Sequence, residues 1–133
     1  MNDDVENTVR QWLAKADMDW VSVEILTEHP RCPRHAVCYH CQQYVEKLLK
    51  AILTLHQIEA PKTHDLRRLI QLSSPMAPEL GALCDRADGM SLAGVAIRYP
   101  DNWREVSEAD MKDMMALADE FAAILLPRLK MGE

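Results

Sequence analysis

The strongest constraint on the fold is a run of apolar residues between about positions 34 and 58. Its members are separated by steps of 3, 4, 3, 4 and 3: Cys38, Cys41, Val45, Leu48, Ile52 and Leu55. Because an α-helix completes a turn in about 3.6 residues, this spacing predicts a helix that packs one face against other helices. The opposite, polar side is expected to carry His40, Gln43, Glu46, Lys47, Lys50, Thr54 and Gln57. Gln42 and Gln43 are expected to lie at the solvated helix surface or at a dimer seam.

Two more stretches show the same period. The first places six residues on one side: Val5, Val9, Trp12, Ala16, Trp20 and Val23. The other, from about 108 to 130, is expected to bury a longer set: Met111, Met114, Met115, Ala118, Phe121, Ala122, Leu125 and Leu129. Ser107 and Asp110 resemble a capping box at its beginning, and Pro127 is expected to bend or fray its end.

Shorter elements are expected between these helices. Thr63 is a candidate N-cap, with Asp65 in the first turn of the helix that follows. A short helix is expected at about 77 to 91, and the stretch "GVAIRYPDNWREV" is expected to form an ordered loop. The sequence therefore predicts an all-α fold, an up-and-down antiparallel helical bundle of three long helices plus one or two short ones, in a single domain over residues 1–133.

Charge and composition weigh against several classes of function. The formal net charge of −6 weighs against a surface that neutralises nucleic-acid phosphates. No apolar run approaches the roughly 20 residues that a membrane span needs. The acidic start, "MNDDVEN", lacks the basic beginning of a secretory signal, so a cytoplasmic location is expected.

The Cys-x-x-Cys at Cys38 and Cys41 raises the question of a metal or redox site. At about 100° per residue the two cysteines lie about 60° apart inside the apolar stripe, whereas His40 lies at least about 100° from each. Structural zinc sites usually combine two separated pairs of ligands. We predict buried thiols, with no metal and no cofactor, and leave the metal and redox interpretations as alternatives.

Three stretches in this order, "CYHCQQYVEKLLKAIL", "APKTHDLRRLI" and "AIRYPDNW" before a final helix, resemble the HEPN domain. The resemblance covers about residues 5 to 129. It implies a helical bundle that pairs into a homodimer and is often encoded beside a minimal nucleotidyltransferase, in some cases as a toxin–antitoxin pair. It also implies, for active members, a metal-independent ribonuclease that uses an arginine followed by four to six residues and a histidine, with two such motifs meeting across the dimer.

The ribonuclease motif is absent at the matching position. Arg98 corresponds to the family arginine, and the residues at the required spacing are Trp103, Arg104 and Glu105. Histidine suits proton transfer near neutral pH, and the last histidine of the chain is His64. Ribonuclease activity thereby loses its main support.

Four residues remain candidates for binding a ligand or an anion: Arg98, Tyr99, His64 and Tyr39. Arg98 is expected either to bind a phosphate or to form a structural ion pair. His64 is expected either to form a local hydrogen bond beside a helix N-cap or to act in catalysis. The tyrosines suit stacking on a base, or packing.

Two functions follow as hypotheses. The first is a non-catalytic, homodimeric HEPN protein that binds a nucleotide or RNA, or is the accessory partner of a nucleotidyltransferase. The alternative is a metal-independent RNA endonuclease with a degenerate site built on Arg98, helped by Glu105 or His64.

Overall fold

A computed structural model describes residues 3–96 and 105–130, with the backbone alone considered for residues 91–96. The long helices are α1 (Asp3–Glu28), α2 (Arg34–Leu55) and α5 (Glu108–Leu125). Two shorter ones, α3 (Leu66–Ser73) and α4 (Cys84–Ala96), are joined by the 3₁₀ turn η1 (Pro78–Leu83). A second 3₁₀ turn, η3 (Leu126–Leu129), follows α5. The predicted all-α bundle of three long and two short helices is therefore confirmed for the described residues.

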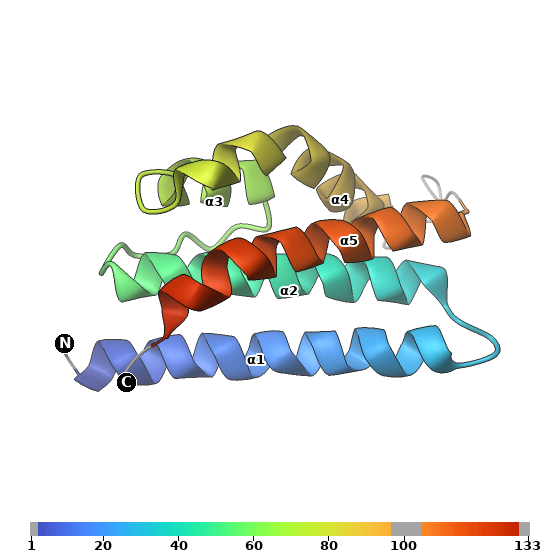
Figure 1. The fold of residues 1–133 in the computed structure, drawn as a ribbon, viewed down its shortest axis with the longest axis horizontal. Coiled ribbons are helices and arrows are strands. Elements are labelled where there is room, and N and C mark those ends of the chain that lie inside the picture. The colour runs from blue at the N-terminus through green and yellow to red at the C-terminus, as the bar shows by residue number, and fades with distance from the viewer. Residues whose placement is uncertain (1–2, 97–104, 131–133) are drawn as a thin grey trace.

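The helices form a bundle in which α2 is central (Figure 1). The helices α1, α2, α4 and α5 alternate in direction along the chain, whereas the short α3 runs in the same direction as α2 (Figure 1). α2 contacts α1 on one side and α3, α4 and α5 on others, whereas α1 packs mainly on α2 and forms an edge of the bundle. This position of α2 explains why its apolar face is so regular.

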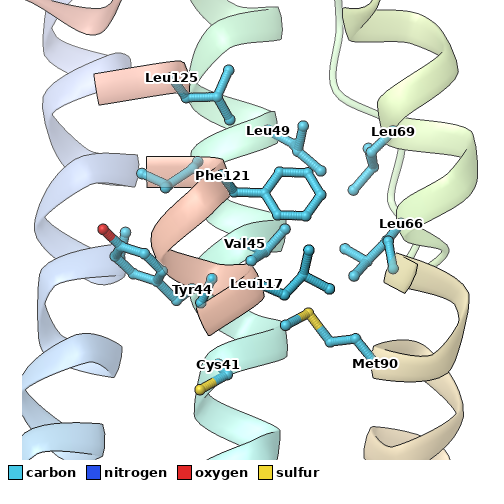
Figure 2. Close-up of a cluster of buried hydrophobic side chains, with 14 of the residues drawn as sticks. Cys41, Tyr44, Val45, Leu49, Leu66, Leu69, Met90, Leu117, Phe121 and Leu125 are labelled. Carbon is cyan, nitrogen blue, oxygen red and sulfur yellow. The ribbon is translucent and has the colours of Figure 1, made fainter. Parts of the chain in front are cut away.

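The core lies where α2, α3, α4 and α5 meet, and Figure 2 shows its side chains. Phe121 and Leu125 of α5 point toward Val45 and Leu49 of α2. Each helix contributes fully buried side chains to one cluster, among them Val9, Leu48, Ile52, Leu66, Leu69 and Met90. Residues of all three predicted apolar stripes belong to this cluster or pack against it.

The helix ends follow local hydrogen bonding. Ser107 caps α5, because its hydroxyl accepts from the Asp110 backbone N–H at 3.0 Å while Asp110 accepts from the Ser107 N–H at 3.4 Å, so the predicted capping box is confirmed. Pro127 lies in η3, where the α-helical pattern has already ended.

The predicted N-cap at Thr63 is wrong. Asp65 caps α3, and its carboxylate accepts from the Arg67 N–H at 3.1 Å. The Thr63 hydroxyl instead accepts from the Asp65 N–H at 3.1 Å, in a turn before the helix. Thr63 thus shapes the approach to α3, and the Asp65 carboxylate satisfies the amide of the second residue of the helix.

The region after α3 also differs from prediction. The expected short helix at 77–91 is two elements, η1 and α4, and α4 continues to Ala96. The first residues of the expected loop at 94–106 are therefore helical, and residues 97–104 lie outside the described residues.

The largest error concerns the polar side of α2. Four of its polar residues are buried rather than exposed: Gln42, Gln43, Glu46 and Lys50. The reason is that neighbouring helices cover α2 on more than its apolar face. Among the described helices, none is both long and apolar enough to cross a membrane.

Candidate functional site: a polar row along α2

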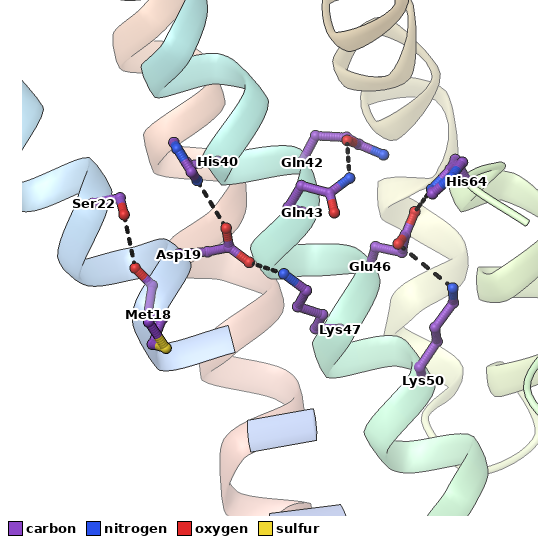
Figure 3. A network of polar contacts seen from close by, with 10 residues as sticks. All are labelled: Met18, Asp19, Ser22, His40, Gln42, Gln43, Glu46, Lys47, Lys50 and His64. Carbon is purple, nitrogen blue, oxygen red and sulfur yellow. Dashed lines mark hydrogen bonds and ion pairs between the residues drawn. The ribbon is translucent and has the colours of Figure 1, made fainter. Parts of the chain in front are cut away.

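Buried and half-buried polar side chains follow α2 in a row that Figure 3 shows. The first group, the α1–α2 cluster, consists of Asp19, His40 and Lys47. Asp19 lies on α1 with its side chain only 9% exposed, and its two carboxylate oxygens face His40 Nδ1 at 2.8 Å and Lys47 Nζ. A nearly buried carboxylate between two nitrogen donors is stabilised by both, so this cluster ties α1 to α2.

The second group, the α2–α3 cluster, consists of Glu46, Lys50 and His64. Glu46 Oε1 lies 2.7 Å from His64 Nδ1, and Glu46 Oε2 lies 3.5 Å from Lys50 Nζ. The Glu46 side chain is 4% exposed, whereas that of His64 is 66% exposed. The buried carboxylate therefore holds one edge of an imidazole whose remaining surface is open to solvent. Lys50 also lies over the Trp12 ring, 5.6 Å from its centroid.

Gln42 and Gln43 lie between the two clusters. The Gln43 side-chain amide donates to Gln42 Oε1 at 2.9 Å, and both residues are buried. This pairing satisfies one donor and one acceptor within α2 itself. The expectation that these glutamines face solvent is wrong.

The structure describes two of the four predicted site residues, His64 and Tyr39. His64 does form a hydrogen bond, but with Glu46 on another helix rather than at the N-cap. Tyr39 lies edge-on to His40, with ring centroids 5.5 Å apart. Arg98 and Tyr99 lie outside the described residues, so their predicted roles stay predictions.

Asp19 is the site residue that sequence reasoning missed, although the sequence contained a signal. It lies three residues after Ala16 and four before Val23, inside the apolar face of the first helix. A carboxylate in that place requires a partner from the neighbouring helix.

Cys38 and Cys41 are buried, as predicted. Burial, followed by the charges of Cys38 and Asp119, raises the pKa of Cys41 from 9.0 to about 12. A thiol with such a pKa is a poor nucleophile and a poor metal ligand at neutral pH. In the described part of the chain, no group of three or more His, Cys, Asp and Glu side chains is placed to hold a metal ion.

Comparison of the sequence with models of known protein families shows the family to which the chain belongs. The family model described as "HEPN domain" matches residues 9–129, nearly the whole chain. The chain belongs to the HEPN family. No curated protein and no solved structure matches it. The Glu46–His64 contact thus connects two of the motifs on which the resemblance to HEPN domains rests.

One arginine and one histidine do have the spacing of the HEPN ribonuclease motif, although sequence reasoning did not single them out. Arg34 and His40 have five residues between them, at the beginning of α2 rather than before the last helix. Arg34 Nη1 donates to the Val106 carbonyl at 3.2 Å, and His40 is held by Asp19. Six helical positions separate their directions by about 120°, so within one chain they do not share a target.

Two hollows lie at the surface of the α1–α2 pair. A groove of about 500 Å³ between the beginning of α1 and the end of α2 is lined by Trp12 and Ile58 but also by the carboxylates of Asp4 and Glu59, which disfavour a phosphate. A second hollow, of about 480 Å³, lies at the α1–α2 turn. It is more polar, and its lining holds two arginines, Arg31 and Arg34, against one carboxylate, Glu108, so it suits an anion better than the first groove does.

Proposed function

We propose that this HEPN protein is a non-catalytic, homodimeric module that binds a nucleotide or serves as the accessory partner of a minimal nucleotidyltransferase, including in a toxin–antitoxin pair. The observation that carries the proposal is the absence of any histidine after His64. Arg98 therefore has no imidazole at the family spacing, and RNA cleavage lacks its usual proton carrier.

The hollow beside Arg31 and Arg34 supports nucleotide binding. Both arginines are exposed, and an arginine can bind a phosphate through two parallel hydrogen bonds. A smaller hollow of about 270 Å³ next to it is also lined by Arg34, together with Glu105 and Val106, which directly follow the segment containing Arg98 in the sequence.

The test uses the purified full-length chain with ATP as probe, in equilibrium dialysis. We expect binding that Arg34→Ala weakens at least about tenfold, which corresponds to about 1.4 kcal/mol. Arg68→Ala, at an exposed arginine on α3, is the matched control and should bind like the wild type. Absence of ATP, GTP, CTP and UTP binding, together with no co-purifying nucleotidyltransferase from native cells, would refute the proposal.

A ribonuclease is the second candidate, because a buried carboxylate orients the exposed ring of His64. With Nδ1 donating to Glu46, Nε2 is free to accept a proton from an RNA 2′-hydroxyl. The two functions are separated by incubation with labelled mixed RNA in excess EDTA. We expect intact RNA. Cleavage that disappears in both Arg98→Ala and His64→Ala would establish the nuclease instead.

A further inference from the structure

The outer face of α1 carries a row of exposed apolar side chains. Met18 is 72% exposed, Ile25 63% and Val21 44%. Ala14 is exposed as well and continues the row, so that its members follow steps of 4, 3 and 4 residues. We define these four residues as the α1 stripe. Among the large apolar side chains of the described residues, only Leu126 is exposed elsewhere to this degree.

The α1 stripe has the spacing of a helix-pairing seam. Steps of three and four residues are those of the a and d positions of a heptad, at which two helices pack side by side. On the inner face of α1, buried apolar residues also recur every seven positions: Val9, Ala16 and Val23 pack against the bundle. α1 therefore has two packing faces, and α2 covers only the inner one.

From this arrangement we infer that a second copy of the chain covers the α1 stripe, with the two α1 helices antiparallel about a two-fold axis between Met18 and Val21. This inference rests on the homodimer of the proposed function and names its surface. A two-fold axis at that point places Met18 opposite Val21 and Ala14 opposite Ile25 of the other copy. Larger side chains thus meet smaller ones along the seam, which is the complementarity that close packing needs.

Charge separates the antiparallel from the parallel arrangement. In the antiparallel pair, Glu28 of one copy lies opposite Arg10 and Gln11 of the other, at both ends of the seam. In the parallel pair, Glu28 faces Glu28, and Arg10 approaches Lys15. All of these side chains are exposed and therefore accessible to a second copy.

Two symmetry-related like-charge approaches remain in the antiparallel pair, each between Asp17 of one copy and Glu24 of the other, at the rim. Both residues are exposed, so water and salt screen their repulsion. These approaches give the arrangement a diagnostic feature, because reversing one of the two charges should strengthen the dimer. With the axis at this point the two α1 helices lie side by side over residues 11–28, a length of about 27 Å.

The first test measures the mass of the full-length chain by sedimentation equilibrium from about 1 to 100 μM. We expect a dimer for the wild type. Met18→Glu and Ile25→Glu should each raise the dimer dissociation constant at least about 30-fold, the effect of a central interface residue. Leu126→Glu, a matched change at an exposed leucine outside α1, should leave it unchanged. Circular dichroism melting shows whether each variant is folded.

The second test addresses orientation. Glu24→Lys should tighten the dimer and Glu28→Lys should weaken it. In a parallel pair residue 24 approaches His29, whose Nδ1 accepts from the Arg31 N–H, so Glu24→Lys should then leave the dimer unchanged. A wild type that stays monomeric at 100 μM would overturn the homodimer itself. A dimer that Met18→Glu and Ile25→Glu leave intact would overturn only this surface. Neither result depends on ATP binding or RNA cleavage, which test the rest of the proposed function.

Discussion

His64 Nδ1 lies 2.7 Å from Glu46 Oε1, and this contact fixes the loop before α3 to the middle of α2. The two residues are 18 positions apart in the sequence. Glu46 also faces Lys50, so a single buried carboxylate holds two basic groups. A charge in the interior is tolerated only with such partners, which makes the α2–α3 cluster a place where the fold depends on specific residues.

Replacing Glu46 with alanine is expected to lower the free energy of unfolding by about 3 kcal/mol, because Lys50 would stay buried without its partner. His64→Ala should cost less, about 1 kcal/mol, since its ring is largely exposed. Urea unfolding followed by circular dichroism measures both. His56→Ala, at an exposed histidine after α2, is the control and should resemble the wild type. Equal stabilities for Glu46→Ala and His56→Ala would show that the cluster contributes nothing.

Asp19 has the same role between α1 and α2. Asp19→Ala removes the acceptor of His40 and Lys47, and we expect a loss of about 2 kcal/mol with faster hydrogen exchange along α1. Asp113→Ala changes an exposed carboxylate on α5 and tests whether loss of charge alone matters. The prediction fails if both variants exchange α1 amides at the same rate.

Phe121 is the one phenylalanine of the chain, and it is fully buried between α5 and α2. Phe121→Ala should destabilise the protein by about 4 kcal/mol, since it removes apolar contacts and leaves a cavity. Leu126→Ala, at a side chain that is 42% exposed, should change the urea midpoint little. A Phe121→Ala variant as stable as Leu126→Ala would contradict the position of the core.

The sequence predicts the helices well because their apolar period is a local property. The steps from Cys38 to Leu55 place the inner face of α2 correctly, and Ser107 with Asp110 marks where α5 begins. Periodicity identifies one packed face only. It cannot show that neighbouring helices also cover Glu46 and Lys50, because those helices come from distant parts of the chain.

The site was harder to predict than the fold for the same reason. The partner of His64 is Glu46, and nothing in the sequence next to "KTHDL" indicates it. At the beginning of α3, Thr63 and Asp65 both favour capping, and the choice between them depends on the turn geometry. Asp19 differs, since its place within an apolar face could have predicted a buried partner.

Cys41 provides a prediction on pH dependence. Its pKa in the folded protein is raised by burial to about 12 from 9.0, so the folded state holds the thiol proton more tightly than the unfolded state does. The resulting stability is fully present below pH 9 and is lost as the pH rises from 9 toward 12, by up to about 1.4 kcal/mol per pH unit. Burial also raises the pKa of Tyr44 above its ordinary value of 10.0. Tyr44 therefore adds to the loss of folding stability once the pH exceeds 10.0. Urea unfolding at pH 8.5, 9.5 and 10.5 should therefore show a smaller fall for Cys41→Ala than for the wild type. Cys84→Ala, at a partly exposed cysteine, is the control, and the same pH profile in all three proteins would contradict the prediction.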